Sequence, residues 1–162
     1  MAPCGNCRGR VGGLHAAHAL ASAPVSVTLI DRRNYHLFRP LLYQVAAGLL
    51  SADEIAAPQR SVLSRYPNVD VLMDEVTGID TANQLVELKQ GQLPYDYLIL
   101  ATGISNNYFG HDEWQRYAPS LQALDDADLI RGRILSAFET AERLSALGET
   151  KPETIQALLT FV

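Results

Sequence analysis

Two glycines and one acid stand at the distance that a dinucleotide-binding unit requires. Gly12 and Gly13 open an alanine-rich stretch, and Asp31 ends a β-branched run that begins at residue 25. In a βαβ unit, amides at the start of the helix receive a pyrophosphate, and an acid at the end of the next strand receives ribose hydroxyls. The spacing from Gly13 to Asp31 is typical of such a unit.

The rest of the glycine fingerprint is replaced by bulkier residues. When Gly13 is taken as the third glycine of G-x-G-x-x-G, the first two positions carry Arg8 and Arg10. Glycines there let the backbone turn tightly and approach phosphate. An arginine pairs with phosphate by charge, but its bulk opposes the turn, and residues 2–7 lack the apolar run of a first strand. This motif taken alone is weak support for a nucleotide site.

A second corner of small residues follows an apolar run later in the chain. Residues 95–101 predict a buried strand that leads into Ala101, Thr102 and Gly103. Small residues at a strand end let a cofactor approach the backbone. An ordinary strand followed by a turn explains the same pattern equally well.

Two other clusters suggest chemistry less strongly. Cys4, Cys7, His15 and His18 are zinc-ligand types, but a zinc finger needs a longer loop and a wider histidine spacing. We expect His15 and His18 to lie on the exposed side of the first helix and not in a zinc site. Residues 111–114, His-Asp-Glu-Trp, are consecutive, so they converge on a reacting atom only if a turn folds them together.

The elements that would position these residues alternate between helix and strand. Pro24 ends a helix over 12–23, and the strand over 25–31 is apolar enough to be covered on both faces in a parallel sheet. Ser51 and Glu54 predict a capping box for a further helix, which Pro58 interrupts or restarts. The remaining expected elements are a small meander returning into a buried strand (69–76, 84–88 and 95–101), a long amphipathic helix over 125–147, and the opening of a strand at 158–162.

Composition excludes several functional classes. The 162 residues suffice for about one domain, and the 13 basic residues, scattered among 18 acidic ones, do not form the footprint of a nucleic-acid binder. The apolar runs are far shorter than the roughly 20 residues of a membrane-spanning helix. Two cysteines exclude a disulfide framework and fit a reducing compartment. Arg8 and Arg10 imitate the start of a signal peptide, but His15 and His18 would interrupt its apolar core.

Several motifs follow one another in a fixed order between about Gly12 and Val162. They read DRRNYHLFRPLLYQVAAGLLS, IAAPQRSVL, EVTGID, LPYDYLILATG, YFGHDEW and IRGRIL. In this order and spacing they resemble type II NADH dehydrogenases. The resemblance implies an α/β fold, an incomplete Rossmann-like FAD-binding domain with a small β-meander and a C-terminal amphipathic helix. It places the chain among the two-dinucleotide-fold flavoproteins that pass electrons from NADH through FAD to a quinone.

The resemblance also implies a role for individual residues. Residues 38–48 line the flavin, with Pro40 and Leu41 beside the cofactor and Gln44, the candidate catalytic residue, near the quinone approach. The other FAD-binding positions are Gly12 and Gly13 at the pyrophosphate, Asp31 at the adenosine ribose, Arg32 near the adenine, Val76 at the adenine through its backbone, and Ala101, Thr102 and Gly103 along the cofactor. No metal is implied.

The segment 38–48 suits a flavin wall on physical grounds. It is too polar for lipid and too apolar for an ordinary surface loop, and an isoalloxazine needs a water-poor surface with a few placed polar groups. A buried turn, with Tyr43 and Gln44 bonded to backbone, is the better explanation if the flanking motifs are ignored. Flavoproteins of the disulfide-reductase branch, which the chain also resembles in fold, carry a redox cysteine pair close to this segment, whereas here the segment contains no cysteine. The resemblance therefore implies direct transfer from flavin to acceptor.

The resemblance implies that the chain is the N-terminal part of a longer enzyme. Residues 1–162 would be a partial FAD-binding domain, with an atypical start at 1–11 and a loop and helical segment at 104–159 that leads toward an NADH-binding domain beginning near residue 160. Hydride transfer requires a positioned nicotinamide, so the chain alone is expected not to turn over.

The resemblance also implies where the longer enzyme works. Members of the family are expected on the cytoplasmic side, peripheral to the inner face of the cytoplasmic membrane and held there by C-terminal helices that this chain lacks. The alternative from another functional class is a noncatalytic FAD-domain remnant that acts as a binding or interaction module. Arg8 and Arg10, at the fingerprint glycine positions, favour this alternative.

Overall fold

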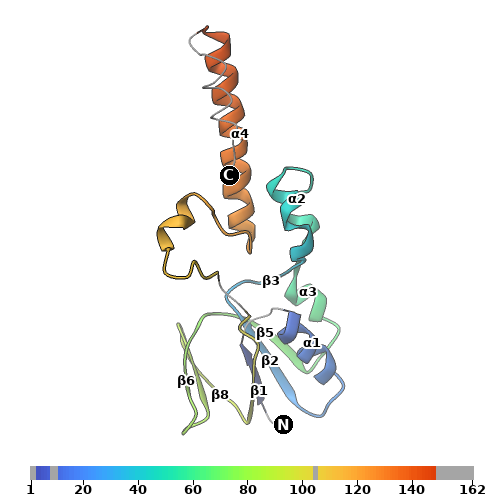
Figure 1. Ribbon diagram of the computed structural model, residues 1–162. Coiled ribbons are helices and arrows are strands. Elements are labelled where there is room, and N and C mark those ends of the chain that lie inside the picture. Colours follow the sequence, from blue (N-terminus) through green and yellow to red (C-terminus); the bar gives the residue numbers. More distant parts are fainter. Residues whose placement is uncertain (1–2, 8–10, 104–105, 149–162) are drawn as a thin grey trace. The chain divides into compact units, whose positions relative to one another are not determined.

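The computed structural model describes residues 3–7, 11–103 and 106–148 (Figure 1). The chain divides into two compact units. One comprises Met1–Leu37 with Ala56–Ser105, and the other comprises Phe38–Ile55 with Asn106–Val162. The strand expected at 158–162 and the two arginines at positions 8 and 10 lie outside the described residues.

The first unit is built on a parallel sheet with the strand order β5-β2-β1-β9. Its strands are β1 (Pro3–Cys7), β2 (Ser26–Asp31), β5 (Val69–Met73) and β9 (Tyr97–Leu100). The helix α1 (Val11–Leu20) connects β1 to β2, so these three elements form a βαβ unit. The strand expected over 25–31 is confirmed.

Residues 2–7 lack the apolar run of a first strand, and the doubt about a strand that was based on this lack is wrong, because β1 forms over Pro3–Cys7. β1 lies between two neighbours, in register with β2 from Pro3↔Ser26 to Cys7↔Ile30 and with β9 from Cys4↔Tyr97 to Cys7↔Leu100. A central strand is stabilised by ladder hydrogen bonds on both edges, and these bonds use backbone groups that every residue except proline supplies in full. An apolar side-chain run is therefore not required for strand formation here.

Both faces of β2 are covered, as its continuous apolar run predicts. On one face, Val27 and Leu29 form a buried cluster with residues of α1 and of α3 (Gln59–Leu63). Ile30 alternates to the opposite face and packs with Val86 of an antiparallel sheet. The side chain of Leu29 is fully buried. Its burial contributes about 2 kcal/mol to folding.

The helix α1 ends at Leu20, earlier than the expected stop at Pro24. The side-chain amide of Asn68 donates hydrogen bonds to the carbonyl oxygens of Leu20 at 3.1 Å and of Val25 at 3.0 Å. Orphan carbonyl groups at a helix end must find partners. Asn68, which is distant in sequence, provides a hydrogen-bond partner here and holds the connection between α1 and β2 in place.

The expected meander is only partly correct. Residues 69–73 join the parallel sheet as β5, and the antiparallel sheet of the first unit is formed by β6 (Val76–Asp80), β7 (Leu85–Leu88) and β8 (Gly91–Pro94). Parts of the segments expected as turns are therefore strand. They contain Gly78, Gly91 and Pro94, which are residues depleted in strands, and pairing with β7 overrides that propensity.

The turn between β6 and β7 is held by its own polar side chains. Asn83 donates from its side-chain amide to Asp80 at 2.7 Å and from its backbone amide at 3.0 Å. These bonds, the side-chain bond first, hold the pKa of the exposed Asp80 carboxyl below its usual value.

The strand β9 was expected to be buried, but it is largely exposed. Tyr97 is 70% exposed and Leu100 is 59% exposed. β9 is the outer strand of the described sheet and pairs only with β1 there. An apolar run predicts a strand, but position within the sheet decides how much of that strand is covered.

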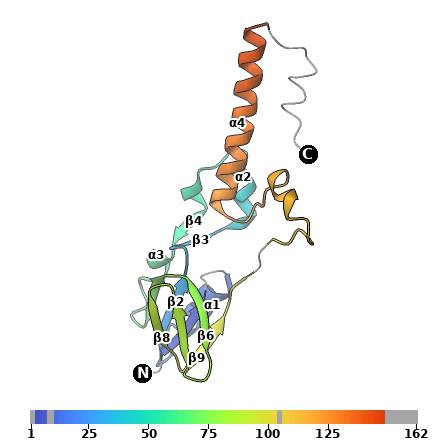
Figure 2. The ribbon, with the colours of Figure 1, turned by 90° about the vertical axis from the view of Figure 1, so that its left-hand side faces the viewer.

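The capping box at Ser51 is confirmed, but a continuous helix after it is not. The carboxylate of Glu54 accepts hydrogen bonds from the backbone amide of Ser51 at 2.7 Å and from its hydroxyl at 2.9 Å. The box caps a single 3-10 turn, η2 (Ala52–Glu54). The chain then forms β4 (Ala56–Pro58), which pairs antiparallel with β3 (Tyr35–Leu37), before α3 begins directly after Pro58 (Figure 2). Of the two predicted effects of Pro58, to interrupt or to restart a helix, the structure shows the second, since α3 begins at Gln59.

The second unit contains the long predicted helix, α4 (Leu124–Ala146), and this prediction is confirmed. The other elements are η1 (Arg39–Leu41), α2 (Leu42–Ala46), η2 and η3 (Asp112–Arg116). α2 packs against α4. The buried residues of α2 are Leu42, Val45 and Ala46, which share one helical face. None of the helices in the described ranges has both the length and the apolarity needed to cross a bilayer.

We expect Asp126→Ala to destabilise α4 by about 1–2 kcal/mol, because one carboxylate oxygen closes the start of this helix. Asp126 Oδ2 accepts hydrogen bonds from the hydroxyl of Ser120 at 2.7 Å and from the amides of Gln122 at 2.8 Å and Ala123 at 3.0 Å. Thermal unfolding followed by far-UV circular dichroism measures the loss. Asp128→Ala, an exposed acid of the same helix, is the matched control. Equal midpoints for the two variants would contradict this assignment of the cap.

Candidate functional site

The carboxyl ends of the parallel strands place the predicted nucleotide residues on one edge of the first unit. Asp31 is the last residue of β2, and α1 begins shortly after the end of β1. Gly12 lies in the first turn of α1, and a Cβ built on it would be 3.5 Å from the Cβ of Ala101, which follows β9. The structure therefore brings the glycine turn and the small-residue corner together.

This corner is open at its surface. Gly12, Thr102 and Gly103 are exposed, whereas Gly13 is buried against the unit. Gly103 has a φ of +69°, in the left-handed region that glycine adopts without steric cost. Ordered small residues at the carboxyl edge of a parallel sheet leave room for a ligand to contact the backbone.

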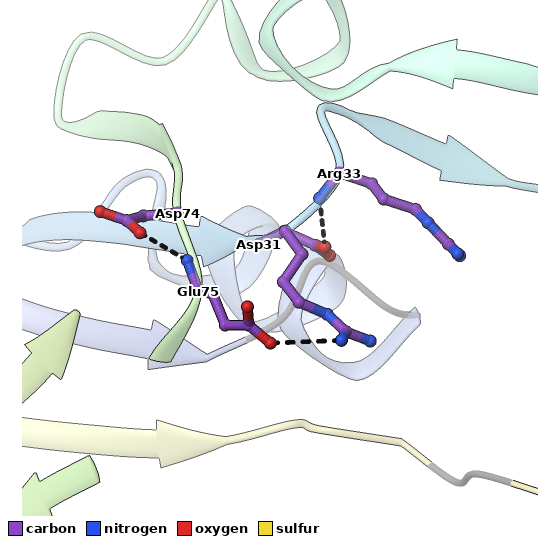
Figure 3. A network of polar contacts seen from close by, with 5 residues as sticks. Asp31, Arg33, Asp74 and Glu75 are labelled. Carbon is purple, nitrogen blue, oxygen red and sulfur yellow. Dashed lines mark hydrogen bonds and ion pairs between the residues drawn. The ribbon is translucent and has the colours of Figure 1, made fainter. Parts of the chain in front are cut away.

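The carboxylate of Asp31 is held by two donors (Figure 3). The backbone amide of Arg33 donates to Oδ1 at 2.9 Å, as the close-up shows, and the side-chain amide of Gln59 donates to Oδ2 at 3.3 Å. The backbone carbonyl of Asp31 accepts from the amide of Asp74 at 3.0 Å. Asp31 as a whole is partly buried.

A polar network continues from Asp31 to the neighbouring strand end. Arg32 forms an ion pair of 3.3 Å with Glu75, and the amide of Glu75 donates to the carboxylate of Asp74 at 2.7 Å (Figure 3). Both partners of the ion pair are close to half exposed. Such a pair stabilises by less than about 1 kcal/mol, so a ligand can replace it at small cost.

Val76 lies at the start of β6, directly after this network. Its side chain is partly buried and packs with the cluster around Ile30 and Val86. Val76 pairs with Leu88 across the antiparallel sheet. Its side chain therefore belongs to the core, which leaves only its backbone for the predicted adenine contact.

Pro40, Leu41 and Gln44 belong to the second unit. Pro40 is exposed and Leu41 is partly buried, both in η1, and Gln44 in α2 donates from its side-chain amide to the hydroxyl of Tyr43 at 2.9 Å. Tyr43 is 56% exposed. The alternative of a buried turn, with Tyr43 and Gln44 bonded to backbone, is therefore not what this unit forms.

The apolar run 38–48 is divided between two roles. Leu42, Val45 and Ala46 are buried, and α2 as a whole packs against α4. Phe38, Pro40 and Tyr43 remain exposed. A helix with one covered face and an exposed apolar remainder accounts for a segment that is too apolar for an ordinary loop.

The histidine predictions are partly confirmed. His15 is exposed on α1, but His18 is partly buried, with Nδ1 at 3.0 Å from the hydroxyl of Tyr66. In the second unit a 3-10 turn stacks His111 on Trp114, with ring centroids 4.2 Å apart. His111 also lies 3.2 Å from Glu113. The cluster is exposed and local, and the zinc alternative depends on Cys4 and Cys7, whose side chains lie outside the description.

Comparison with known proteins agrees with this geometry. The family described as pyridine nucleotide-disulphide oxidoreductase matches residues 9–146. The chain belongs to this family. The type II NADH:quinone oxidoreductase Ndh of Mycobacterium tuberculosis is 50% identical over 154 residues, which cover 93% of this chain and 32% of that protein. NdhA of the same organism is 50% identical over 135 residues, which cover 81% and 29%.

A solved relative shares the fold. NDH2 from Plasmodium falciparum superimposes with a TM-score of 0.79 at 25% identity, covering 95% of this chain and 32% of that one. The chain is therefore homologous to the N-terminal region of type II NADH:quinone oxidoreductases and spans about a third of the length of these relatives. The family resemblance and the Rossmann-like α/β class inferred from the motifs are confirmed.

Sequence reasoning did not find Gln59, Asp74 and Glu75 in this pyridine nucleotide-disulphide oxidoreductase chain. A signal existed for the two acids, because they follow β5 as Arg32 and Arg33 follow β2. Ends of neighbouring parallel strands share one edge of a sheet. Gln59 gave no such signal, since only the pairing of β3 with β4 carries it to Asp31.

We expect Gly12→Leu to weaken FAD binding by about tenfold while the unit stays folded, because the added side chain would stand in the open corner. Gly12 is exposed, and among the residues that the structure describes its Cβ position would contact Ala101 alone, at an ordinary distance. Fluorescence titration with FAD measures the effect. Gly12→Ala adds one methyl group at a permitted distance and serves as the control, with a change below about threefold. Equal affinities for the leucine and alanine variants would show that no ligand passes this corner.

Proposed function

We propose that this chain binds FAD and forms the flavin-binding part of a type II NADH:quinone oxidoreductase. In that enzyme NADH would deliver a hydride to the flavin, and the electrons would pass to a quinone. The observation that carries the proposal is the carboxylate of Asp31, held by two donors at the carboxyl edge of a sheet whose glycine turn lies against Ala101. The 50% identity with Ndh over 93% of the chain supports the same activity.

The residues of the first unit fit the adenosine and pyrophosphate end of FAD. Asp31 offers acceptors to ribose hydroxyls, and Gly12 and Gly13 start a helix whose first amides suit a pyrophosphate. Arg32 and the backbone of Val76 flank the same edge and are assigned to the adenine. Thr102 and Gly103, exposed after Ala101, would run along the cofactor.

The assignments within residues 38–48 concern the flavin ring and the quinone. We assign Pro40 and Leu41 to the flavin ring and Gln44 to the approach of the quinone. When bound, FAD supplies two-electron acceptance from a hydride and stepwise donation to a quinone. The side-chain amide of Gln44 already donates to Tyr43 in this unit, so Tyr43 would orient it.

Further proposals concern the protein as a whole. We assign residues 1–162 to a partial FAD-binding domain, with an atypical start at 1–11, a connecting segment at 104–159 and an NADH-binding domain expected from about residue 160. NADH and quinone would be its substrates, at the cytoplasmic face of the membrane. The chain alone would bind flavin without turnover, because hydride transfer requires nicotinamide held against the ring.

The test is direct. The purified chain is expected to carry the visible absorption of bound flavin, or to acquire it on incubation with FAD. A folded product that is colourless once excess FAD has been removed by gel filtration would refute the proposal. The second candidate, a noncatalytic remnant or interaction module, is favoured by Arg8 and Arg10 in place of fingerprint glycines. A nucleotide sequence without a second glycine-rich motif in any downstream frame would support that candidate instead.

A further inference from the structure

Gln59 is a fully buried polar side chain beside the candidate site. It is the first residue of α3 and follows Pro58. Burying an amide is costly unless hydrogen bonds replace those it makes to water. A leucine or methionine would fill the same volume without that cost. The burial of Gln59 therefore indicates that its side-chain amide has a specific role.

Gln59 bonds to three residues at the end of β2 and in the loop that follows it. It does so through its backbone amide and its side-chain amide. Its backbone amide donates to the carbonyl of Asn34 at 3.1 Å. Its side-chain Nε2 donates to Asp31 Oδ2 at 3.3 Å and to the carbonyl of Tyr35 at 3.4 Å. Both Nε2 hydrogens are thus directed at this loop, one of them at the carboxylate.

The bond from Gln59 completes the restraint on Asp31. The amide of Arg33 holds Oδ1 at 2.9 Å, and Gln59 holds Oδ2, so the plane of the carboxylate is set by one donor on each oxygen. An ionised carboxylate has about four acceptor positions. After the donors of the described residues are counted, about two positions remain, which matches the two hydroxyls of an adenosine ribose.

The choice of a neutral donor is also meaningful. An arginine at this place would form an ion pair with Asp31 and compete with weaker hydroxyl donors. A glutamate would face Asp31 with a second negative charge. Glutamine orients the carboxylate and leaves its charge available to the ligand.

We propose that Gln59 is a positioning residue that presents the Asp31 carboxylate to the adenosine ribose of FAD. The inference rests on the proposed FAD function and deepens it. Gln59 acts only through Asp31 and does not touch the ligand. A ligand that lacks the adenosine ribose, such as FMN, should therefore not depend on Gln59.

The test is a double-mutant cycle in the full 162-residue chain. Four proteins are titrated with FAD and with FMN: the unaltered chain, Gln59→Met, Asp31→Ala and the double variant. Methionine keeps the length of the side chain and removes its donor. We expect Gln59→Met to weaken the affinity for FAD by about tenfold and to change the affinity for FMN by less than about twofold. In a chain that already carries Asp31→Ala, we expect Gln59→Met to cause no further loss of FAD affinity.

Three results would overturn the inference. An equal loss of affinity for FAD and for FMN would show that Gln59 only supports the fold. An unchanged FAD affinity would show that Gln59 has no role at the ribose. Losses of FAD affinity that add up in the double variant would show that Gln59 does not act through Asp31. If Gln59→Met fails to fold, the side-chain amide resonance of Gln59 in the unaltered chain replaces it. That resonance should shift on addition of FAD and not of FMN, and an absent shift with FAD counts against the inference.

The two proposals fail in different ways. If Asp31→Ala leaves FAD affinity unchanged, the assignment of Asp31 to the ribose is wrong and the role of Gln59 falls with it. If Asp31→Ala weakens the affinity for FAD but not for FMN, and Gln59→Met leaves the FAD affinity unchanged, only the role of Gln59 is wrong. Absence of FAD binding by the unaltered chain would overturn both.

Discussion

Asp31→Ala is expected to weaken FAD binding by about 100-fold. The substitution removes two hydrogen bonds from ribose hydroxyls to a charged acceptor, each worth about 1.5 kcal/mol, and tenfold in affinity corresponds to about 1.4 kcal/mol. The carboxylate is already oriented by Arg33 and Gln59, so little ordering is needed on binding. Titration of the chain with FAD, followed by flavin fluorescence, measures the loss.

The matched control for this experiment is Asp70→Ala. Asp70 is an exposed acid near the start of β5, so its replacement changes the net charge by the same amount at a site away from the carboxyl ends of the strands. We expect it to leave FAD affinity within about twofold. Similar losses in both variants would point to a change in charge or folding, and an unchanged affinity in Asp31→Ala would remove this residue from the binding site.

The double variant Arg8→Gly with Arg10→Gly is expected to raise FAD affinity by about 30-fold. Glycine at these fingerprint positions permits the tight turn and close approach to the pyrophosphate, and an ordinary residue forced into such a backbone costs about 1 kcal/mol at each position. The two contributions together correspond to about 30-fold in the dissociation constant. Flavin retained after gel filtration and the FAD dissociation constant are the measurements.

A charge-conserving pair separates the two effects of these arginines. Arg8→Lys with Arg10→Lys keeps both positive charges and the side-chain bulk, and we expect its FAD affinity to stay within about threefold of the unaltered chain. If the glycine variant binds FAD more weakly than the unaltered chain, the arginines hold the phosphate by charge. If it binds FAD with the same affinity, Gly13 is not the third glycine of the fingerprint.

Several features of the fold could be predicted because they depend on local patterns. The spacing of apolar residues over 125–147 predicts α4, and the β-branched run ending at Asp31 predicts β2. Ser51 and Glu54 predict the capping box that the structure contains. These features need only neighbours within a turn of helix or a single strand.

Other features depend on partners that are distant in sequence. β1 contains no apolar run and forms because β2 and β9 pair with both of its edges. β5 follows the same kind of pattern as the meander strands but pairs with β2, and the exposure of β9 follows from its outer position. Pairing partners and sheet order cannot be deduced from side-chain periodicity, because every strand offers the same backbone donors and acceptors.

The sequence by itself determined the residue types of the candidate site: a glycine turn, an acid after the second strand and a small-residue corner, in an order that matches a family. Only the tertiary structure decided that Gly12 lies against Ala101 and that Gln59, 28 residues after Asp31, donates to its carboxylate. Spacing along the chain reports which chemical groups are present. The contact between those groups depends on which strands pair and which faces pack, and these are set by burial and hydrogen bonding across the whole unit.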